Sequence, residues 1–338
     1  MHCTRLPYAY GKPNISAKLK SQNQDFIVEE QIAFELSGEG EHLWLWLEKD
    51  GENTDWVAQQ LAKWAGIKLR DIGYAGLKDR HAVTRQWFSL YLPGKADPDL
   101  QSFKFDSMRI LKTTRHQRKL QTGGLSGNRF ILTLREISGD KDELETRLKQ
   151  IQQQGVPNYF GVQRFGRNEN NLVMAQRLFD GELTRLKPAQ RSLYISAARS
   201  YLFNLIVAKR VEQGCWNSAL AGDVFQLEGS DKWFVDDGSA DLAQRVIELD
   251  IHPTAAMVGA GDLPSQHHTQ QLEQSVLHPN QAWLSALAEM GLKQDRRATR
   301  VLPQAMCWEW VAKDAIQIRF GLRPGSYATA VIRESANS

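Results

Sequence analysis

The order of the expected elements constrains this fold most, because strand-rich segments lie at both ends of a largely helical middle. Residues 1–154 and the segment after Pro303 show strand patterns, whereas residues 155–302 are mainly helical in pattern. Strands from both ends of the chain can join one sheet. We therefore expect a discontinuous domain of residues 1–154 plus 303–338, with residues 155–302 inserted into it.

The first part of the chain is expected to combine strands with one helix, an α+β pattern with a predominantly antiparallel sheet. Asn53 or Thr54 offers an N-cap to the helix, and Gly66 supplies its C-terminal stop. The expected strands, in chain order, are residues 25–30, 42–47, 86–92 and 129–134.

The middle of the chain is expected to be mostly helical. A charged helix is expected at residues 140–154, and the strongest run spans residues 192–213, where Ala197, Tyr201 and Leu205 share a face. Later expected elements are a strand pair at 224–235, a loop at 259–264, a hairpin of strands 306–311 and 315–322, and a final helix capped by Gly325-Ser326.

Length and composition fit a globular protein. With 338 residues, of which 42% are hydrophobic, the chain can bury a sizeable core and is expected to form two domains. Its N-terminus lacks a signal-peptide pattern, and no run approaches the roughly 18 apolar residues of a membrane helix. Cys3, Cys215 and Cys307 are widely separated, which argues against a disulfide framework or a cysteine zinc site. We therefore expect a cytoplasmic protein without membrane attachment.

Basic residues cluster between residues 104 and 135, although the net charge of the chain is only +3. Asp106 is the only acid in this segment. Such a bias is typical either of a solvated charged face or of a surface that follows phosphates, and both alternatives stay open. The basic residues are Lys104, Arg109, Lys112, Arg115, Arg118, Lys119, Arg129 and Arg135.

A glycine-framed turn within residues 73–90 is the clearest candidate for chemistry, because it presents Lys78 and Asp79 between two apolar strands. Gly73 and Gly76 permit close backbone approach or a positive φ. A loop that is held by two strands can aim a catalytic carboxylate accurately. The same residues also fit an ordinary solvated hairpin turn, so both interpretations of this stretch stay open.

The sequence indicates neither a metal site nor a nucleotide cofactor. The histidine pair His267-His268 has no carboxylate or cysteine at metal-ligand spacing. The acidic turn Asp236-Asp237-Gly238 is typical of a β-turn rather than of a cation loop. Neither a G-x-x-x-x-G-K-[ST] loop nor a G-x-G-x-x-G motif after a strand is present, so we expect no cofactor.

Two further segments contain candidate binding residues. In the segment GNRF, Asn128 is typical of a turn and Phe130 of a core aromatic. The segment NYFGVQRFG, residues 158–166, combines two Phe-Gly steps with Phe160 and Arg164 and has no regular periodicity. An irregular, aromatic and basic segment at a domain junction is typical of a binding cleft.

The chain resembles the TruD family of tRNA pseudouridine synthases in six segments along essentially its whole length, which are DFIVEE, GYAGLKDRHAVTRQW, GNRF, NYFGVQRFG, SAARSYLFN and PGSYATAVIRE. The resemblance implies an α+β pseudouridine synthase fold, with a mixed, mostly antiparallel sheet and an inserted, mainly helical TRUD domain. It implies that residues 1–154 plus 303–338 are the catalytic domain. It also implies isomerisation of uridine to pseudouridine, in bacterial members at uridine 13 of tRNA, without a cofactor.

The same resemblance implies the site residues. Asp79, in the G-x-K-D motif, matches the catalytic aspartate, and Lys20 matches the basic residue that faces it. Phe130 takes the place where other pseudouridine synthase families have a tyrosine stacked on the target base, with Asn128 beside it. The chain departs from the common Pro-Glu-Asp-Phe pattern, because residues 23–24 are Asn-Gln.

Pseudouridine formation breaks the bond from C1′ to N1, turns the uracil and joins C1′ to C5, so it needs a carboxylate near the sugar. An ionised Asp79 can attack C1′ or abstract a sugar proton toward a glycal, and both routes stay open. The rival classes are a non-catalytic RNA-binding protein of the same fold and an aspartate-based hydrolase or transferase of nucleosides. The expected partner is tRNA; no obligate protein partner is indicated, and we expect a monomer.

Overall fold

Two parts of the chain each have a core of their own in the computed structural model, which describes residues 6–337. The first part, the sheet unit, comprises Ile15–Lys141, Pro303–Gly325 and Asn337. The second part, the helical unit, comprises the described residues up to Asn14, together with Asp142–Leu302 and Ser326–Ala336. The expected division at residues 154 and 302 assigns a catalytic and an inserted domain, and that assignment stays a prediction.

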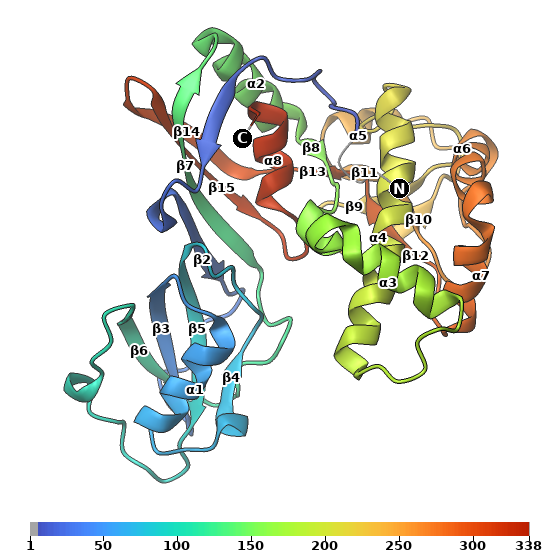
Figure 1. Cartoon of the computed structure of the whole chain (residues 1–338). Coiled ribbons are helices and arrows are strands. Elements are labelled where there is room, and N and C mark those ends of the chain that lie inside the picture. The colour runs from blue at the N-terminus through green and yellow to red at the C-terminus, as the bar shows by residue number, and fades with distance from the viewer. Residues whose placement is uncertain (1–5, 338) are drawn as a thin grey trace. The chain divides into compact units, whose positions relative to one another are not determined.

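Nine strands form one sheet in the sheet unit, namely β1 (Ser16–Leu19), β2 (Phe26–Gln31), β3 (His42–Asp50), β4 (Ile72–Tyr74), β5 (Val83–Tyr91), β6 (Met108–His116), β7 (Gly127–Ser138), β14 (Gln304–Ala312) and β15 (Ala315–Leu322). Their order is β14-β15-β7-β2-β5-β3-β6, with β1 paired to β7 and β4 paired to β5 (Figure 1). All neighbours are antiparallel except β2 and β5, which are parallel. The expected α+β fold with a mixed, mostly antiparallel sheet is confirmed.

Alternation along β3 directs apolar side chains to both faces of this sheet. Leu43, Leu45 and Leu47 are buried in a core that they share with α1 (Thr54–Trp64). Trp44 is buried in a separate aromatic cluster. The tryptophan-rich first third of the chain therefore packs two cores, one on each side of the sheet.

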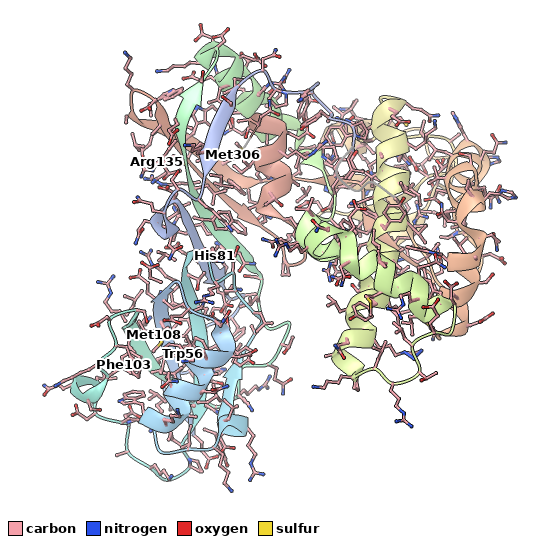
Figure 2. All side chains as sticks on the ribbon, in the orientation of Figure 1. Trp56, His81, Phe103, Met108, Arg135 and Met306 are labelled. Carbon is pink, nitrogen blue, oxygen red and sulfur yellow. The ribbon has the colours of Figure 1, made fainter. Side chains whose placement is uncertain are left out.

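Helix α1 begins and ends where the sequence indicates. Asn53 occupies its N-cap position, and Gly66 follows it with a left-handed φ of 62°. The core next to α1 is rich in large side chains, of which Figure 2 labels Trp56, Phe103 and Met108. This packing fixes the first turn of α1, whose Thr54 contacts the loop of residues 75–82 between β4 and β5.

The helices of the helical unit are α2 (Lys141–Gln154), α3 (Asn170–Phe179), α4 (Pro188–Glu212), α5 (Leu242–Ile247), α6 (His267–Leu277), α7 (Gln281–Glu289) and α8 (Ala328–Ser335). Its strands are β8 (Val156–Pro157), β9 (Val224–Leu227), β10 (Trp233–Val235), β11 (Ile251–Met257), β12 (Asp295–Ala298) and β13 (Arg300–Val301). The strands form an antiparallel sheet in the order β10-β9-β11-β12 and a separate pair, β13-β8. Helix α4 is long, as Figure 1 shows. Its buried residues contribute much of the core of this unit.

The sequence analysis did not predict strands β11 and β6, and it placed the start of the final helix too early; each difference has a physical reason. β11 is buried at nearly every position, so it lacks the alternation of a half-buried strand. β6 lies at the edge of its sheet and carries Arg109, Lys112 and Arg115, which hide its strand pattern. The final helix has Tyr327 at its N-cap, so the expected cap at residues 325–326 was placed too early.

Two of the three cysteines lie in the described part of the chain. Cys215 is buried and Cys307 is exposed, and neither forms a disulfide there. Cys3 lies outside the described residues. Within residues 6–337 no helix is long and apolar enough to cross a membrane, and no group of three or more His, Cys, Asp or Glu side chains is arranged to hold a metal ion.

Candidate active site

The loop between β4 and β5, residues 75–82, carries Asp79. In β4, just before the loop, the backbone of Leu120 packs closely against Gly73. A Cβ on Gly73 would lie only 2.4 Å from the carbonyl oxygen of Leu120. Gly76 is different: no atom lies within 4 Å of its Cβ position, and its φ is not positive. Only Gly73 therefore has the close approach that the sequence indicates.

Asp79 is partly buried and is held by two donors. The Nζ of Lys20 donates to Asp79 Oδ2, and the backbone N–H of His81, which Figure 2 labels, donates to Oδ1 at 3.0 Å. Burial alone raises the pKa of Asp79, but the hydrogen bonds from Lys20 and His81 outweigh it, so that this pKa lies below its ordinary value. The carboxylate is therefore charged at neutral pH.

Lys20 reaches Asp79 through an unusual backbone conformation. It follows β1 with a φ of 61°, in the left-handed region that residues other than glycine seldom adopt. Its Nζ also lies 4.0 Å from the centre of the Phe26 ring. Strained backbone of this kind is concentrated at functional sites. The structure thus brings Lys20 and Asp79 together, as the family resemblance implied.

Lys78 contacts a different carboxylate from the one next to it in sequence. Its Nζ lies 2.7 Å from Glu30 Oε1, and its amide N–H donates to Thr54 Oγ1 at 3.0 Å. Sequence reasoning missed Glu30 and Thr54 as parts of the site. The signal for Glu30 was its position two residues after Val28 in β2, on the same buried face of the strand.

Another lysine near the site was also missed. Lys49 in β3 is fully buried, and its Nζ donates to the carbonyl oxygen of Glu52 at 2.6 Å. Burial lowers the pKa of Lys49 to about 8, while the negative charge of Asp79 acts in the opposite direction. A buried lysine inside a strand has no distinctive sequence pattern, so the burial of Lys49 and its electrostatic interaction with Asp79 could be found only from the structure.

Phe130 lies in β7, between β2 and β15, and is only 7% exposed. Its ring stacks on Phe320 with a centroid distance of 5.6 Å and meets the Phe26 ring edge to face at 6.2 Å. Phe26 in turn lies under Lys20. These contacts connect Phe130 to the Asp79 group, but they leave little of its ring open.

Asn128 lies in the same strand, two residues before Phe130. Its Oδ1 is buried and has no hydrogen-bond partner among the residues that the structure describes. A buried amide oxygen without a partner is costly, unless water or a ligand supplies a donor. Asn128 thus offers an acceptor on the strand that carries Phe130.

Phe160 and Arg164 belong to the helical unit. Arg164 donates to Ser196 Oγ at 3.1 Å and to Tyr327 Oη at 2.6 Å, and its guanidinium lies 5.4 Å from the centre of the buried Phe160 ring. Arg297, which sequence reasoning missed, lies over the same ring at 4.3 Å. Two cations thus share one aromatic ring, an arrangement that suits an anionic ligand.

The basic segment divides into bound and exposed residues. Arg115 pairs with Asp97 and donates to the carbonyl oxygen of Lys95 at 3.0 Å, so its charge is engaged within the protein. In contrast, the side chains of Lys104, Lys112 and Arg118 are exposed. Arg109 and Arg129 are exposed too, but they pair with Glu48 and Glu29. Lys104, Lys112 and Arg118 are therefore the members of the segment best placed to meet phosphates.

Comparisons with known proteins give one consistent result. The profile of the family described as tRNA pseudouridine synthase D (TruD) matches residues 4–184 and 169–335. A tRNA pseudouridine synthase D from Hydrogenovibrio crunogenus is 56% identical over 331 residues, covering 98% of this chain and 96% of that protein. Another, from Proteus mirabilis, is 48% identical over 332 residues, covering 97% and 94%. A solved TruD structure from Methanosarcina mazei has the same fold, with a TM-score of 0.78, 22% identity and coverage of 97% and 95%.

Proposed function

This chain belongs to the TruD family of tRNA pseudouridine synthases, and we propose that it isomerises uridine 13 of tRNA to pseudouridine with Asp79 as the catalytic aspartate. The observation that carries this proposal is the state of Asp79, which is partly buried and yet held charged by Lys20. A charged carboxylate on a fixed loop is what the reaction needs near C1′ of the ribose.

The chemistry follows from that charge. Asp79 either attacks C1′, so that uracil leaves with the electron pair of the C1′–N1 bond, or removes a sugar proton to form a glycal. The uracil then turns and its C5 bonds to C1′. In the first route this breaks the bond between Asp79 and C1′; in the second, the uracil has left as the glycal forms, and C2′ regains its proton when C5 adds. The proton on C5 is released and N1 gains one, so the product is an isomer of the substrate. Isomerisation leaves the redox state unchanged, so we propose no redox cofactor, and we assign the catalytic group to Asp79 and not to a metal.

Access to C1′ requires the uridine to leave its stack, at a cost of a few kcal/mol. We assign Asn128 to the uracil, because its buried Oδ1 can accept a hydrogen bond from a base N–H. Phe130, on the same strand, is assigned to the flipped base as well. Its contact is restricted to the exposed edge, because one face of the ring stacks on Phe320.

Phe130→Leu is expected to lower the single-turnover rate roughly 3- to 5-fold, because a contact with the exposed edge of the ring should contribute less than the about 1–3 kcal/mol of full base–aromatic stacking. Leucine keeps apolar volume in the core, so the free energy of unfolding should fall by only about 1–2 kcal/mol. Tritium release and thermal melting would be measured on the same samples.

Phe88→Leu is the matched control, because Phe88 is a fully buried phenylalanine of the same sheet whose ring contacts Tyr74 and not Phe130. It should cost similar stability with little change in rate. Equal rates in the two variants would make Phe130 a core residue without a role in base binding.

We assign Phe160 and Arg164 to the RNA as well. Arg164 donates to two hydroxyl groups, and its Nε is buried without a hydrogen-bond partner among the described residues, so the guanidinium keeps a donor for an anion. A phosphodiester is the anion that tRNA supplies.

The exposed residues of the basic segment are expected to add to tRNA binding. The triple variant Lys104→Ala, Lys112→Ala and Arg118→Ala should bind tRNA roughly tenfold more weakly, and each lost phosphate contact should lower the salt slope by about one. Filter binding at several salt concentrations measures both. An unchanged slope would show that these residues form only a solvated face. Arg115→Ala should lower the melting temperature, because its partners lie within the protein.

We further propose that the protein acts in the cytoplasm as a monomer, without an obligate protein partner. The cytoplasmic location fits a soluble tRNA as the substrate. Size-exclusion chromatography with light scattering tests the monomer directly, and a stable dimer would contradict it.

The activity itself is tested by tritium release from C5-tritiated uridine in an unmodified tRNA transcript, followed by mapping of the modified position. Release that maps to uridine 13 supports the proposal. Modification at another uridine would keep the reaction and change the substrate position. Binding of tRNA without any release would favour the non-catalytic RNA-binding alternative.

A further inference from the structure

Lys78 is anchored to the sheet unit through both its backbone and its side chain. Its amide N–H donates to Thr54 Oγ1 at 3.0 Å, and the Thr54 hydroxyl donates in turn to Gln86 Oε1 at 3.2 Å. Its ammonium lies 2.7 Å from Glu30 Oε1. Consecutive Cα atoms are about 3.8 Å apart, so these anchors act directly beside Asp79.

Glu30 is a prepared partner for this ammonium. Its side chain is fully buried, and its Oε2 accepts the backbone N–H of Trp87 at 2.9 Å. Burial raises the pKa of Glu30, and the charge of Lys78 opposes that effect. A buried carboxylate is costly without a partner, so the pair ties the loop to both β2 and β5.

The three consecutive residues 77–79 differ sharply in exposure. Leu77 is 69% exposed, whereas the side chain of Lys78 is only 9% exposed and that of Asp79 is 27% exposed. Lys78 is therefore the inward residue of the loop, and Asp79 is the neighbouring residue that substrate can reach. A shift of the inward residue would move the carboxylate with it.

We propose that the buried ion pair between Lys78 and Glu30 is a positioning device, which holds the loop so that Asp79 is aimed at the ribose, while Lys20 keeps the carboxylate charged. The inference rests on the proposed function. Lys78 is a positioning residue here, since it acts on the substrate only through Asp79. The donors that lower the pKa of Asp79 are Lys20 and His81, so the role of Lys78 is geometric.

The decisive variant removes both charges of the pair at once. In Lys78→Met/Glu30→Gln, the glutamine oxygen can still accept the Trp87 N–H, and no uncompensated charge stays buried. We expect a melting temperature close to that of the wild type. The single-turnover rate at saturating tRNA should nevertheless fall about 100-fold, because a misplacement of about 1 Å can cost that much.

Three readouts separate positioning from a merely structural role. The dissociation constant for tRNA should change less than about threefold, so that the loss lies in the chemical step. The acidic limb of the pH–rate profile should stay in place, since Lys20 still holds Asp79. Asp223→Asn, which weakens the fully buried pair with Arg210 in the helical unit, should lower the melting temperature and leave the single-turnover rate unchanged.

The outcomes are distinct. A double variant that is stable and reacts at the wild-type rate would overturn the inference, and so would a loss that lies wholly in tRNA affinity. If the double variant does not fold, Glu30→Gln alone is measured, and a wild-type rate there would equally overturn it. Absence of tritium release from the wild type would instead contradict the proposed function.

Discussion

Asp79→Asn is expected to lower C5-tritium release from tRNA by at least about 1,000-fold, while tRNA affinity changes less than about threefold. Asparagine has nearly the same shape and keeps an oxygen that can accept a hydrogen bond from Lys20. It has no negative charge and is a poor nucleophile and base. The variant should therefore lose the chemical step but keep the conformation of the loop that carries residue 79.

The matched control is Asp55→Asn, because Asp55 is a carboxylate of the same unit that accepts a hydrogen bond from Tyr74 Oη at 2.6 Å. It should release tritium at close to the wild-type rate. Single-turnover release and filter binding would be measured side by side for the two variants. Release by Asp79→Asn within tenfold of the wild type would remove Asp79 from the catalytic role.

The candidate loop was found from sequence because its signal is local. Glycine at residue 73, the Lys78-Asp79 pair and two flanking strands all lie within 18 residues, and β4 and β5 have the expected antiparallel pairing. The partner of Asp79 was found only through the family resemblance. Lys20 lies 59 residues away, and a left-handed turn that no residue pattern announces directs it to the loop.

The partner of Lys78 was not found, because the sequence places Asp79 beside it and Glu30 far from it. Neighbouring side chains in an extended loop point in opposite directions, so adjacency in sequence argues against contact. The parallel pairing of β2 with β5 brings Glu30 to the loop. That pairing depends on tertiary packing, which local patterns do not specify.

The partners of the surface residues in the basic segment could not be predicted from the sequence either, because they too depend on tertiary packing. The composition of this segment indicated eight comparable cations, yet β6 directs Arg109 toward Glu48 at 2.9 Å and Arg115 toward Asp97. Whether a charge is free for RNA depends on the partner that the fold brings to it. For this reason the binding test uses Lys104, Lys112 and Arg118, which are exposed, and omits the exposed Arg109 and Arg129, which pair with carboxylates.

Lys20→Met is expected to slow the reaction roughly 10- to 100-fold at neutral pH, because a hydrogen bond between charged groups contributes about 1.5–3 kcal/mol. The pH dependence should change as well. In the wild type, burial raises the pKa of Asp79 but the donors Lys20 and His81 lower it further, so the carboxylate stays charged into the acidic range. Without Lys20 the burial effect dominates, and the acidic limb of the pH–rate profile should move to higher pH.

The ion pair between Lys20 and Asp79 should also contribute to the free energy of unfolding. Because the folded-state pKa of Asp79 is lowered, the stabilisation is present above the unfolded-state pKa and is lost as the pH falls through the folded-state pKa. Lys20→Met should therefore be less stable than the wild type at neutral pH, with the difference shrinking in acid. Lys18→Met is the control, since Lys18 lies two residues before Lys20, in β1, and pairs with the exposed Glu136 at 2.6 Å. An acidic limb that moves equally in both variants, or in neither, would show that Lys20 does not set the charge of Asp79.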